Sequence, residues 1–504
     1  MNIFSYILIN FLYFIGSSTA WSFGVGYYTL YRPVIAGMLT GLILGDVTMG
    51  MMAGAIVNIV YLDFVSTGGS LKGDPCLTGI IAAISAIVFK INAVEALAVA
   101  FPFGFIGILI WKYRLNINIY FVKKLESSTN LNSKSSMFVY NALLPQLLLL
   151  GMSSIIMIIC FLIIYILQSY FTAYYELLRN VLFLSGMFLI INSIFINILR
   201  IKDIKLVYLY FLTCAVFLIV NSNIIIYGLL AFLIYYIFID YKNASKVNCN
   251  KNDTSGIITK ASLFKSWAIW MNFSHACYNF ERMQGLAFAH TMNNIICKLY
   301  DNESERIERI KYYTDFFNAE PNLGTPIHGY VISLEEKRAN NEEEIDINNL
   351  KKGMMGVVSG LGDSLTQTVL TPIFISFCIY FALSKNLIGT IIFVLTLAFI
   401  IIYISYSGFL KGYYNGKTGL IERINEVKNS KVKKYFNIIF SILFVLIVFM
   451  LRVNYINLIK LNLINLIIIL FSSTLYQFLL YKKIKENYLI PLVYLIPLMI
   501  VLIV

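Results

Sequence analysis

Asp363 is the side chain best placed to do chemistry, because it is a lone charge in a long apolar stretch. It lies in residues 353–372, GMMGVVSGLGDSLTQTVLTP, among four glycines and several hydroxyl side chains, and no other charged residue occurs between Lys352 and Lys385. A carboxylate at membrane depth is costly to keep and is by default a candidate for a functional site. The alternative is a helix cap, in which the carboxylate accepts backbone N–H bonds.

A similar pattern occurs earlier in the chain, around Asp74. Residues 69–78 read GSLKGDPCLT and residues 359–366 read SGLGDSLT, so each has Gly-Asp among small and hydroxyl side chains, followed by Leu-Thr. Transporters often contain paired repeats whose broken helices meet at a shared midplane site. Our hypothesis is that the loops around Asp74 and Asp363 face one another across one substrate site.

The composition indicates a membrane protein. The 504 residues are 59% hydrophobic and only 13% charged, against about 25% charged residues in soluble domains, and the mean hydropathy is +0.77. Several segments without Asp, Glu, Lys or Arg reach the length of about 20 apolar residues that a membrane span needs. We therefore predict an all-α polytopic membrane protein.

The net charge of +13 does not indicate a nucleic-acid partner, because the basic residues form short clusters beside the apolar segments. Clusters of this kind are typical of cytoplasmic loops. We expect contact with membrane lipids and none with nucleic acid. The clusters are Lys112, Arg114, Lys123 and Lys124; Arg200, Lys202 and Lys205; Lys428, Lys431, Lys433 and Lys434; and Lys482, Lys483 and Lys485.

The cysteines and histidines show no pattern of a metal or disulfide site. The seven cysteines are scattered without a CxxC pair, which favours a packing role. The three histidines have no metal-ligand spacing. We expect no metal and no cofactor.

A polar stretch divides the chain. Residues 240–260, DYKNASKVNCNKNDTSGIITK, are rich in Asn and Lys and poor in large apolar residues, which is typical of a linker. The division that we predict is a first membrane domain, a polar linker and a second domain, at residues 1–243, 244–262 and 263–504. The second domain has amphipathic helices in residues 263–352 and membrane segments in residues 353–504. By itself, the charged part at 263–352 would be a cytosolic domain.

Several motifs of the second half resemble a known family. Residues 279–284 read NFERMQ, residues 316–318 read FFN, residues 334–340 read LEEKRAN, and the glycine-rich residues 353–363 follow. In this order they resemble the IID subunit of the mannose, fructose and sorbose family of bacterial phosphotransferase-system permeases.

The first half is similar to the partner IIC subunit of that family. The resemblance is carried by Arg32-Pro33, by the glycines of residues 37–54, and by the loop at residues 68–74. The whole chain is thus similar to a IIC subunit fused to a IID subunit, which are usually separate polypeptides. The join would fall in the polar linker.

The resemblance implies a sugar permease of the bacterial cytoplasmic membrane. It would import a mannose-type hexose or an amino sugar, which separate IIA and IIB proteins phosphorylate with phosphoryl groups from phosphoenolpyruvate. No phosphorylation site is expected on this chain. The family builds IIC and IID as related helical folds of opposite orientation, with broken or re-entrant segments, and assembles them as trimers, so a homotrimer of the fused chain is expected. The resemblance also assigns residues 263–352 to the membrane-associated fold.

Sugars are bound by carboxylate and amide groups in desolvated pockets, which gives two sets of candidate residues. The candidates for substrate binding are Asp74, Asp363, Asn58, Ser66, Thr67, Gly69, Ser364 and Thr366. The candidates for ion pairs that hold the fold are Glu281 with Arg282, and Glu335 and Glu336 with Arg338, since charges at membrane depth usually pair.

The chain departs from the family pattern near these residues. Asn58 stands where IIC members commonly have glutamate. Ser364 and Leu365 stand where IID members commonly have proline and an aromatic residue. These departures leave the identity of the sugar open.

Two other classes of function fit the same features. A membrane-embedded glycosyl- or acyltransferase would also use isolated carboxylates and basic loops, but it would act on a lipid-linked substrate without soluble partners. A binding scaffold or receptor for a secreted peptide would bind without transport.

Overall fold

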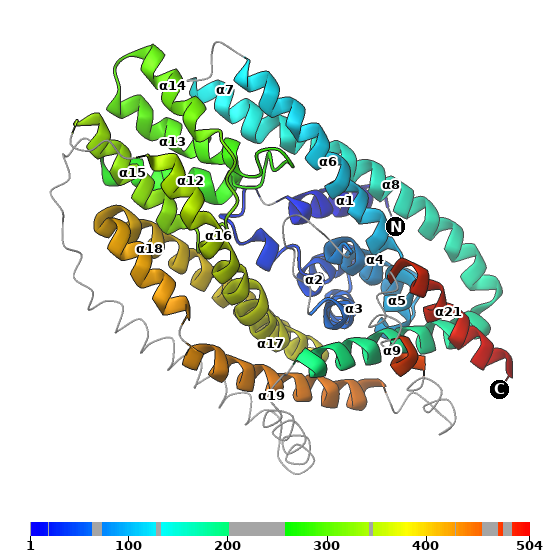
Figure 1. The fold of residues 1–504 in the computed structure, drawn as a ribbon. Helices are drawn as coiled ribbons and strands as arrows, with labels where there is room; N and C mark the ends of the chain where they lie inside the picture. The colour runs from blue at the N-terminus through cyan, green and yellow to red at the C-terminus, as the bar shows by residue number, and fades with distance from the viewer. Residues whose placement is uncertain are drawn as a thin grey trace.

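The computed structural model describes residues 2–18, 20–62, 73–127, 133–200, 258–341, 346–428, 430–455, 472–476 and 486–503. Within these ranges every regular element is a helix and only isolated β-bridges occur, at Asn279, Met283 and Phe317. The predicted all-α fold is confirmed (Figure 1).

The first half of the described chain ends at Arg200. Its α-helices are α1 (Ile3–Ser17), α2 (Pro33–Leu44), α3 (Val47–Val60), α4 (Pro75–Val88), α5 (Ala93–Ala100), α6 (Phe103–Glu126), α7 (Lys134–Phe138), α8 (Leu144–Ala173) and α9 (Tyr175–Arg200). A 3-10 turn, η1 (Gly26–Tyr28), follows α1, and a π-turn, η2 (Val139–Leu143), joins α7 to α8.

The second half begins at Ile258. Its α-helices are α12 (Lys260–Phe273), α13 (Gly285–Leu299), α14 (Glu303–Tyr313), α15 (Thr325–Ala339), α16 (Ile347–Leu365), α17 (Thr371–Leu383), α18 (Leu387–Lys428), α19 (Ser430–Tyr455) and α21 (Glu486–Ile503). A π-turn, η3 (Thr366–Leu370), joins α16 to α17. Residues 244–257 of the predicted linker lie outside the described residues, and α12 begins within the last residues of the linker, at Lys260.

Glycines allow α2 and α3 to pack at backbone contact. A Cβ on Gly37 would lie 2.5 Å from the Gly50 carbonyl oxygen, and one on Gly54 would lie 2.2 Å from the Pro33 carbonyl oxygen. A side chain at any of these positions would push the helices apart. The glycine spacing in this part of the sequence therefore has a packing role.

The segment around Asp363 is a helix, and the prediction of a loop there was wrong. Residues 347–383 form one long helical segment in which η3 joins α16 to α17. Its glycines have no positive φ. Three of them, Gly353, Gly356 and Gly360, face open space. The glycines thus keep one side of α16 narrow instead of breaking it.

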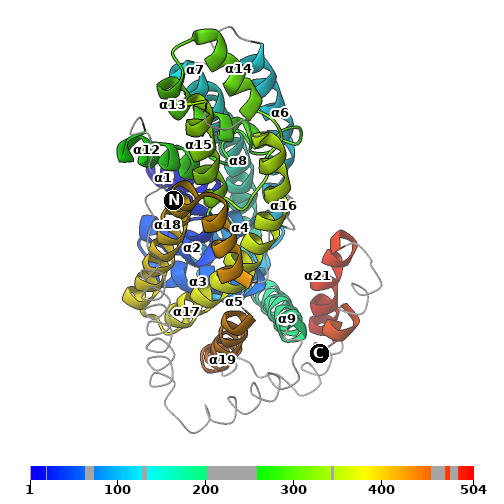
Figure 2. The ribbon, with the colours of Figure 1, turned by 60° about the vertical axis from the view of Figure 1, so that its left-hand side comes forward.

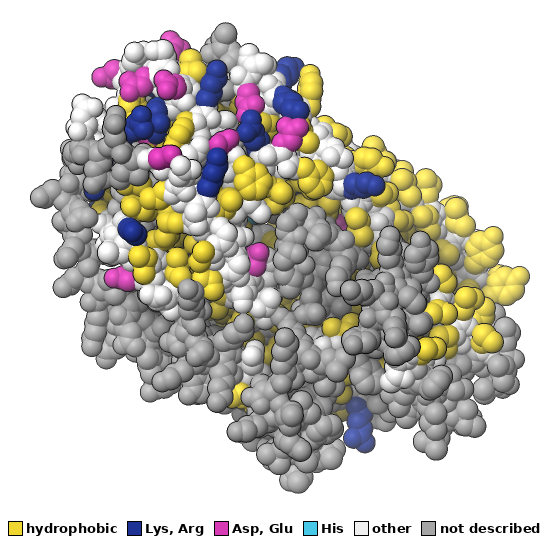
Figure 3. All heavy atoms as spheres, viewed as in Figure 1, with side chains coloured by type: hydrophobic (Ala, Val, Ile, Leu, Met, Phe, Trp, Pro, Cys, Tyr) yellow, Lys and Arg dark blue, Asp and Glu magenta, His cyan; other side chains and the backbone are white. Residues whose placement is uncertain are grey.

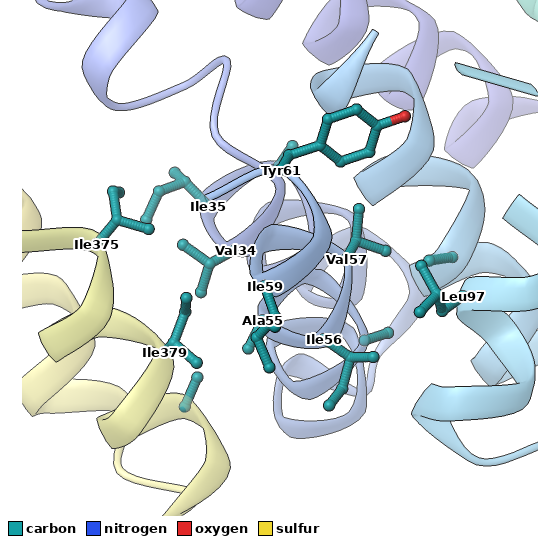
Figure 4. Close-up of a cluster of buried hydrophobic side chains, with 14 of the residues drawn as sticks. Val34, Ile35, Ala55, Ile56, Val57, Ile59, Tyr61, Leu97, Ile375 and Ile379 are labelled. Atoms are coloured by element: carbon teal, nitrogen blue, oxygen red, sulfur yellow. The ribbon is translucent and has the colours of Figure 1, made fainter. Parts of the chain in front are cut away.

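The two halves share their hydrophobic cores. In the larger core, α17 packs against α3, and Ile375 and Ile379 of α17 lie beside Val34 and Ile35 of α2 (Figure 4). A second core joins Val122 and other side chains of the first half to α12, α13 and α15. The halves are therefore packed together and do not form separate cores.

Four helical segments of the described chain are long and apolar enough to cross a membrane, or five if a bent pair of helices counts as one span. The bent pair is α5 and α6, with an angle of 44° beside Pro102, as expected for a break at proline. The four segments are Lys134–Phe171, Ile347–Leu383, Leu387–Glu422 and Asn437–Tyr455.

The surface separates into charged and apolar regions. Figures 1 and 2 both show α7, α13 and α14 at one end of the molecule and α9 and α19 at the other. Charged side chains gather at the end with α14, whereas apolar side chains cover α8 (Figure 3). Large exposed side chains of α8 include Ile155, Ile158, Leu162, Tyr165 and Ile166. An apolar exposed face of this length suits contact with lipid.

Candidate functional site

A polar cavity of about 110 Å³ lies between the two halves. The first half contributes α6 and the segment that contains η1. The second half contributes the α16–η3 segment and two loops, at residues 274–278 and 318–321. Because each half supplies only part of the wall, the cavity exists only where the halves meet.

One wall is a stripe of polar side chains along α16 and η3. Ser359, Asp363 and Gln367 line the cavity and are spaced by four residues, which places them on one helix face. Gln367 Nε2 donates to Asp363 Oδ1 at 2.7 Å. Within the described residues no hydrogen bond to Asp363 Oδ2 is found, so this oxygen can accept a hydrogen bond from a ligand.

Glu320 is the second carboxylate of the cavity, and only 2% of it is exposed. Its Oε1 accepts hydrogen bonds from the Tyr28 hydroxyl and from Asn322 Nδ2, both at 2.9 Å. Its Oε2 accepts the backbone N–H groups of Asn322 at 3.0 Å and Leu323 at 2.5 Å. Burial raises the pKa of the Glu320 carboxyl above its usual range, against the lowering effect of these donors.

Aromatic side chains form much of the remaining wall. Tyr27 and Tyr28 come from the segment around η1, Trp111 from α6 and Tyr278 from a loop. The Tyr278 hydroxyl donates to Asn318 Oδ1 at 3.1 Å. Burial raises the pKa of Tyr278 to about 12, and the negative charge of Asp363 is the second cause of this rise. Rings of this kind offer apolar faces together with polar tips.

The NFERMQ motif at residues 279–284 holds the two cavity loops together. Asn279 Oδ1 accepts the backbone N–H groups of the next turn at 2.9 and 3.1 Å, as in an Asx-turn. Gln284 exchanges two hydrogen bonds of 3.0 Å with the backbone of Ala319. Its Nε2 also lies 3.1 Å from Nε2 of His275. The motif thus positions residues of the cavity wall without lining the cavity.

Helix α6 binds the loop at residues 274–278 from the other half. Arg114 Nη2 donates to the carbonyl oxygens of His275 and Ala276, both at 2.9 Å. Asn118 Nδ2 donates to the carbonyl oxygen of Tyr278 at 2.8 Å. Burial, followed by the charge of Arg114, lowers the pKa of His275 to about 4. The imidazole that faces the cavity is therefore neutral at neutral pH.

Asp363 is the predicted substrate-binding residue that the structure places in the cavity wall. Asp74 instead caps α4: its Oδ1 accepts the Leu77 N–H at 3.0 Å, and its Oδ2 accepts the Tyr13 hydroxyl at 2.7 Å. It is 1% exposed. Asp74 is thus a helix cap, the role that was considered as the alternative for Asp363. Because Asp74 does not line the cavity, the two aspartates do not face one another across it.

The other predicted substrate-binding residues lie outside the cavity wall or outside the described chain. Asn58 is buried, and its Oδ1 accepts the Val34 N–H at 3.4 Å. The Thr366 hydroxyl donates to the carbonyl oxygen of Gly362 at 2.9 Å, and Ser364 lies next to Asp363 on another face of α16. Ser66, Thr67 and Gly69 lie outside the described residues.

Glu281 and Arg282 form ion pairs, but with other residues and not with each other. Glu281 pairs with Lys123 at 2.8 Å, and Arg282 pairs with Asp315 at 3.1 Å and with Glu126 at 3.4 Å. Two of these pairs join α6 to the NFERMQ motif. They therefore link the first half to the second half near the surface.

Glu335 and Glu336 contact residues other than Arg338, and their predicted pairs with Arg338 stay a prediction. Glu335 Oε2 lies 2.6 Å from Nη2 of Arg309, and its Oε1 accepts the Tyr300 hydroxyl at 2.8 Å. Glu336 Oε2 accepts the Tyr413 hydroxyl at 2.6 Å. These buried contacts fix α15 to its neighbours.

Glu320, Tyr28 and Trp111 also line the cavity but were not among the residues predicted from the sequence. A usable signal was present for Glu320, because Glu320-Pro321-Asn322-Leu323 repeats the acid-Pro-x-Leu pattern of residues 74–77. Within the described residues no three His, Cys, Asp or Glu side chains come together to hold a metal ion.

Within the described residues the regular elements are helices, and the two halves meet at a cavity lined by polar and aromatic side chains, which is compatible with a helical membrane transport component. Residues 3–237 match the family described as the sorbose-specific IIC component of the phosphotransferase system, and residues 257–504 match the mannose/fructose/sorbose family IID component. The chain belongs to this phosphotransferase-system family and joins a IIC component to a IID component.

Individual relatives match parts of the chain. The mannose-specific EIID component of Escherichia coli K12 is 34% identical over 170 residues, which are 33% of this chain and 56% of the relative. The sorbose-specific EIIC component of Klebsiella pneumoniae is 31% identical over 94 residues, 19% of this chain and 35% of the relative. The chain thus spans about half the length, or less, of these curated relatives.

A solved structure is also similar to part of the chain. It is a cryo-EM structure of the mannose transporter ManYZ in complex with microcin E492. The matched chain is 25% identical, with a TM-score of 0.30, and the match covers 47% of this chain and 94% of the other.

Proposed function

We propose that this chain is the membrane-embedded IIC–IID part of a phosphoenolpyruvate-dependent sugar phosphotransferase system. It imports a mannose-type hexose or an amino sugar, which separate IIA and IIB proteins phosphorylate. The observation that carries the proposal is the cavity between the IIC and IID parts, with Asp363 in its wall.

The chemistry of the cavity suits a neutral sugar. Asp363 and Gln367 offer hydrogen-bond acceptors and a donor side by side, and Trp111 offers an apolar face for the ring of a hexose. Because water is largely excluded from such a pocket, each correct hydrogen bond contributes strongly to specificity.

The same lining disfavours a phosphorylated product. Asp363 and Glu320 are both acidic, and among the described residues of the cavity wall there is no Lys or Arg. A sugar phosphate would be repelled by these carboxylates, since like charges in a desolvated site destabilise one another. Phosphorylation by the soluble partners would therefore promote release from this site.

The proposal includes the location and the assembly. The apolar spans and the positively charged loops fit the bacterial cytoplasmic membrane, with the basic loops in the cytoplasm. We propose a homotrimer of the fused chain. Native mass measurement of the detergent-solubilised protein tests the trimer, and a monomer at all concentrations would contradict it.

The test of the function is uptake of labelled mannose and glucosamine into vesicles that contain this chain. We expect accumulation of the sugar phosphate only when phosphoenolpyruvate and both IIA and IIB proteins are supplied. Vesicles without the chain are the control. Accumulation independent of phosphoenolpyruvate and the soluble partners would contradict the proposal. Turnover of a lipid-linked substrate instead would support the transferase alternative.

A further inference from the structure

Two carboxylates in this fold are held in the same way, although they lie in different halves. Asp74 and Glu320 are each followed by proline, and each accepts the backbone N–H of the leucine three residues later. Each also accepts a tyrosine hydroxyl on its other oxygen, from Tyr13 to Asp74 at 2.7 Å and from Tyr28 to Glu320 at 2.9 Å.

A glycine of a long helix packs against each carboxylate side chain. A Cβ on Gly107 of α6 would lie 2.4 Å from Cβ of Asp74, and one on Gly362 of α16 would lie 2.6 Å from Cβ of Glu320. Sequence pattern, hydrogen bonds and packing therefore agree. Glu320, and not Asp363, is the internal counterpart of Asp74.

The two copies differ in where the tyrosine comes from. Tyr13 and Asp74 both belong to the first half and are both buried away from the cavity. Tyr28 belongs to the first half and Glu320 to the second, and both line the cavity. The second copy is thus a hydrogen bond between the halves at the substrate site.

The hydrogen-bonding capacity of Glu320 is filled. A carboxylate has about four acceptor sites, and Glu320 accepts four donors, of which three come from Asn322 and Leu323 in the same turn. The fourth donor is Tyr28. A ligand hydroxyl can bind Glu320 only by displacing a donor, and Tyr28 is the donor from the other half.

We propose that the Tyr28–Glu320 hydrogen bond is a latch between the two halves, which the substrate opens when a sugar hydroxyl takes the place of the Tyr28 hydroxyl on Glu320. The inference rests on the proposed function for the identity of the ligand. Asp363 Oδ2 accepts a hydrogen bond from the sugar directly, whereas Glu320 becomes available only as the latch opens. Binding of substrate is thereby coupled to loosening of one contact between the IIC and IID parts.

The first test compares Tyr28→Phe with Tyr13→Phe in the full chain, using mannose as the probe in membrane vesicles. Removal of the competing hydroxyl should lower the Kd for mannose by about tenfold. In the original chain only the molecules with an open latch bind sugar, so the apparent affinity is the intrinsic affinity multiplied by the open fraction. Tyr13→Phe removes the same group from the buried copy and should leave the affinity unchanged. Unchanged or weaker binding by Tyr28→Phe, or equal tightening by Tyr13→Phe, would overturn the latch.

A second readout does not depend on the identity of the sugar. A cysteine introduced by Ser359→Cys reports access to the cavity through its rate of maleimide labelling, with the chain lacking this substitution as background. The rate without sugar should be higher in the Tyr28→Phe background, and mannose, which would occupy the cavity beside residue 359, should lower it in both backgrounds. Equal rates in both backgrounds would overturn the latch. A higher rate with Tyr28→Phe but no response to any sugar would keep the contact and overturn the sugar assignment.

Discussion

Replacement of Asp363 by asparagine should weaken sugar binding strongly while it leaves the fold intact. The amide has the shape of the carboxylate, and its oxygen can still accept the 2.7 Å hydrogen bond from Gln367. What is lost is the negative charge of this cavity-lining side chain and the acceptor at Oδ2, to which no hydrogen bond is found within the described residues. A hydrogen bond to a charged group contributes about 1.5–3 kcal/mol, so the Kd for mannose should rise about 10- to 150-fold.

The assay is equilibrium binding of labelled mannose to the purified chain, with uptake in vesicles as a second measurement. Ser364→Ala is the matched control, because Ser364 is the next residue of α16 but does not line the cavity. We expect its Kd to stay within about twofold of the original, as for a substitution that removes no ligand contact. An unchanged Kd for Asp363→Asn, or equal losses in both variants, would refute the assignment of this wall to sugar binding.

Two further predictions concern stability. Glu335→Gln should reduce the free energy of unfolding by about 3–5 kcal/mol, because it leaves the buried Arg309 without its counter-charge. Lys123→Gln should reduce it by at most about 1 kcal/mol, since the pair of Lys123 with Glu281 is largely exposed. Unfolding of the detergent-purified variants measures both free energies, and equal losses would contradict the distinction. The pKa of His275 is about 4 in the fold and about 6.5 in the unfolded chain. Between about pH 4 and pH 6.5 the imidazole is therefore protonated in the unfolded chain but neutral in the folded one. His275 therefore stabilises fully above pH 6.5 and less as the pH falls towards 4, and in His275→Gln the thermal midpoint should fall less between pH 7 and pH 5; an identical fall in both proteins would contradict this role.

The class of fold could be predicted from the sequence, because the thickness of the membrane sets the length of the apolar segments and its two sides set the charge of the loops. The fate of Asp363 was harder to predict. Glycine is compatible with a loop and with a narrow helix face. The helical backbone of α16 and the packing of Gly362 against Glu320 show that the second holds here. Asp363 lies in the cavity wall, and its role in substrate binding stays a prediction, whereas the loop predicted around it is a helix.

The ion pairs show where reasoning from near neighbours in the sequence is misleading. Glu281 and Arg282 are adjacent, so their side chains point in different directions, and both find partners on other segments. Glu335 and Arg338 are three residues apart, which does allow contact on a helix. Glu335 nevertheless forms a bidentate ion pair with Arg309 of α14, and two tyrosine hydroxyls also donate to its carboxylate. Pairing between helices depends on their packing, which single-sequence patterns do not contain.

The cavity shows why neither half of the sequence could have predicted the site alone. Its wall needs Trp111 and Tyr28 from the IIC part and Asp363 and Glu320 from the IID part. Arg114 completes the arrangement, because it donates to backbone carbonyl groups that belong to the other half. Loss of that guanidinium would leave buried carbonyl oxygens without a partner. Joining the two components in one chain keeps these complementary surfaces at a high effective concentration, so the cavity is formed by the same contacts that hold IIC and IID together.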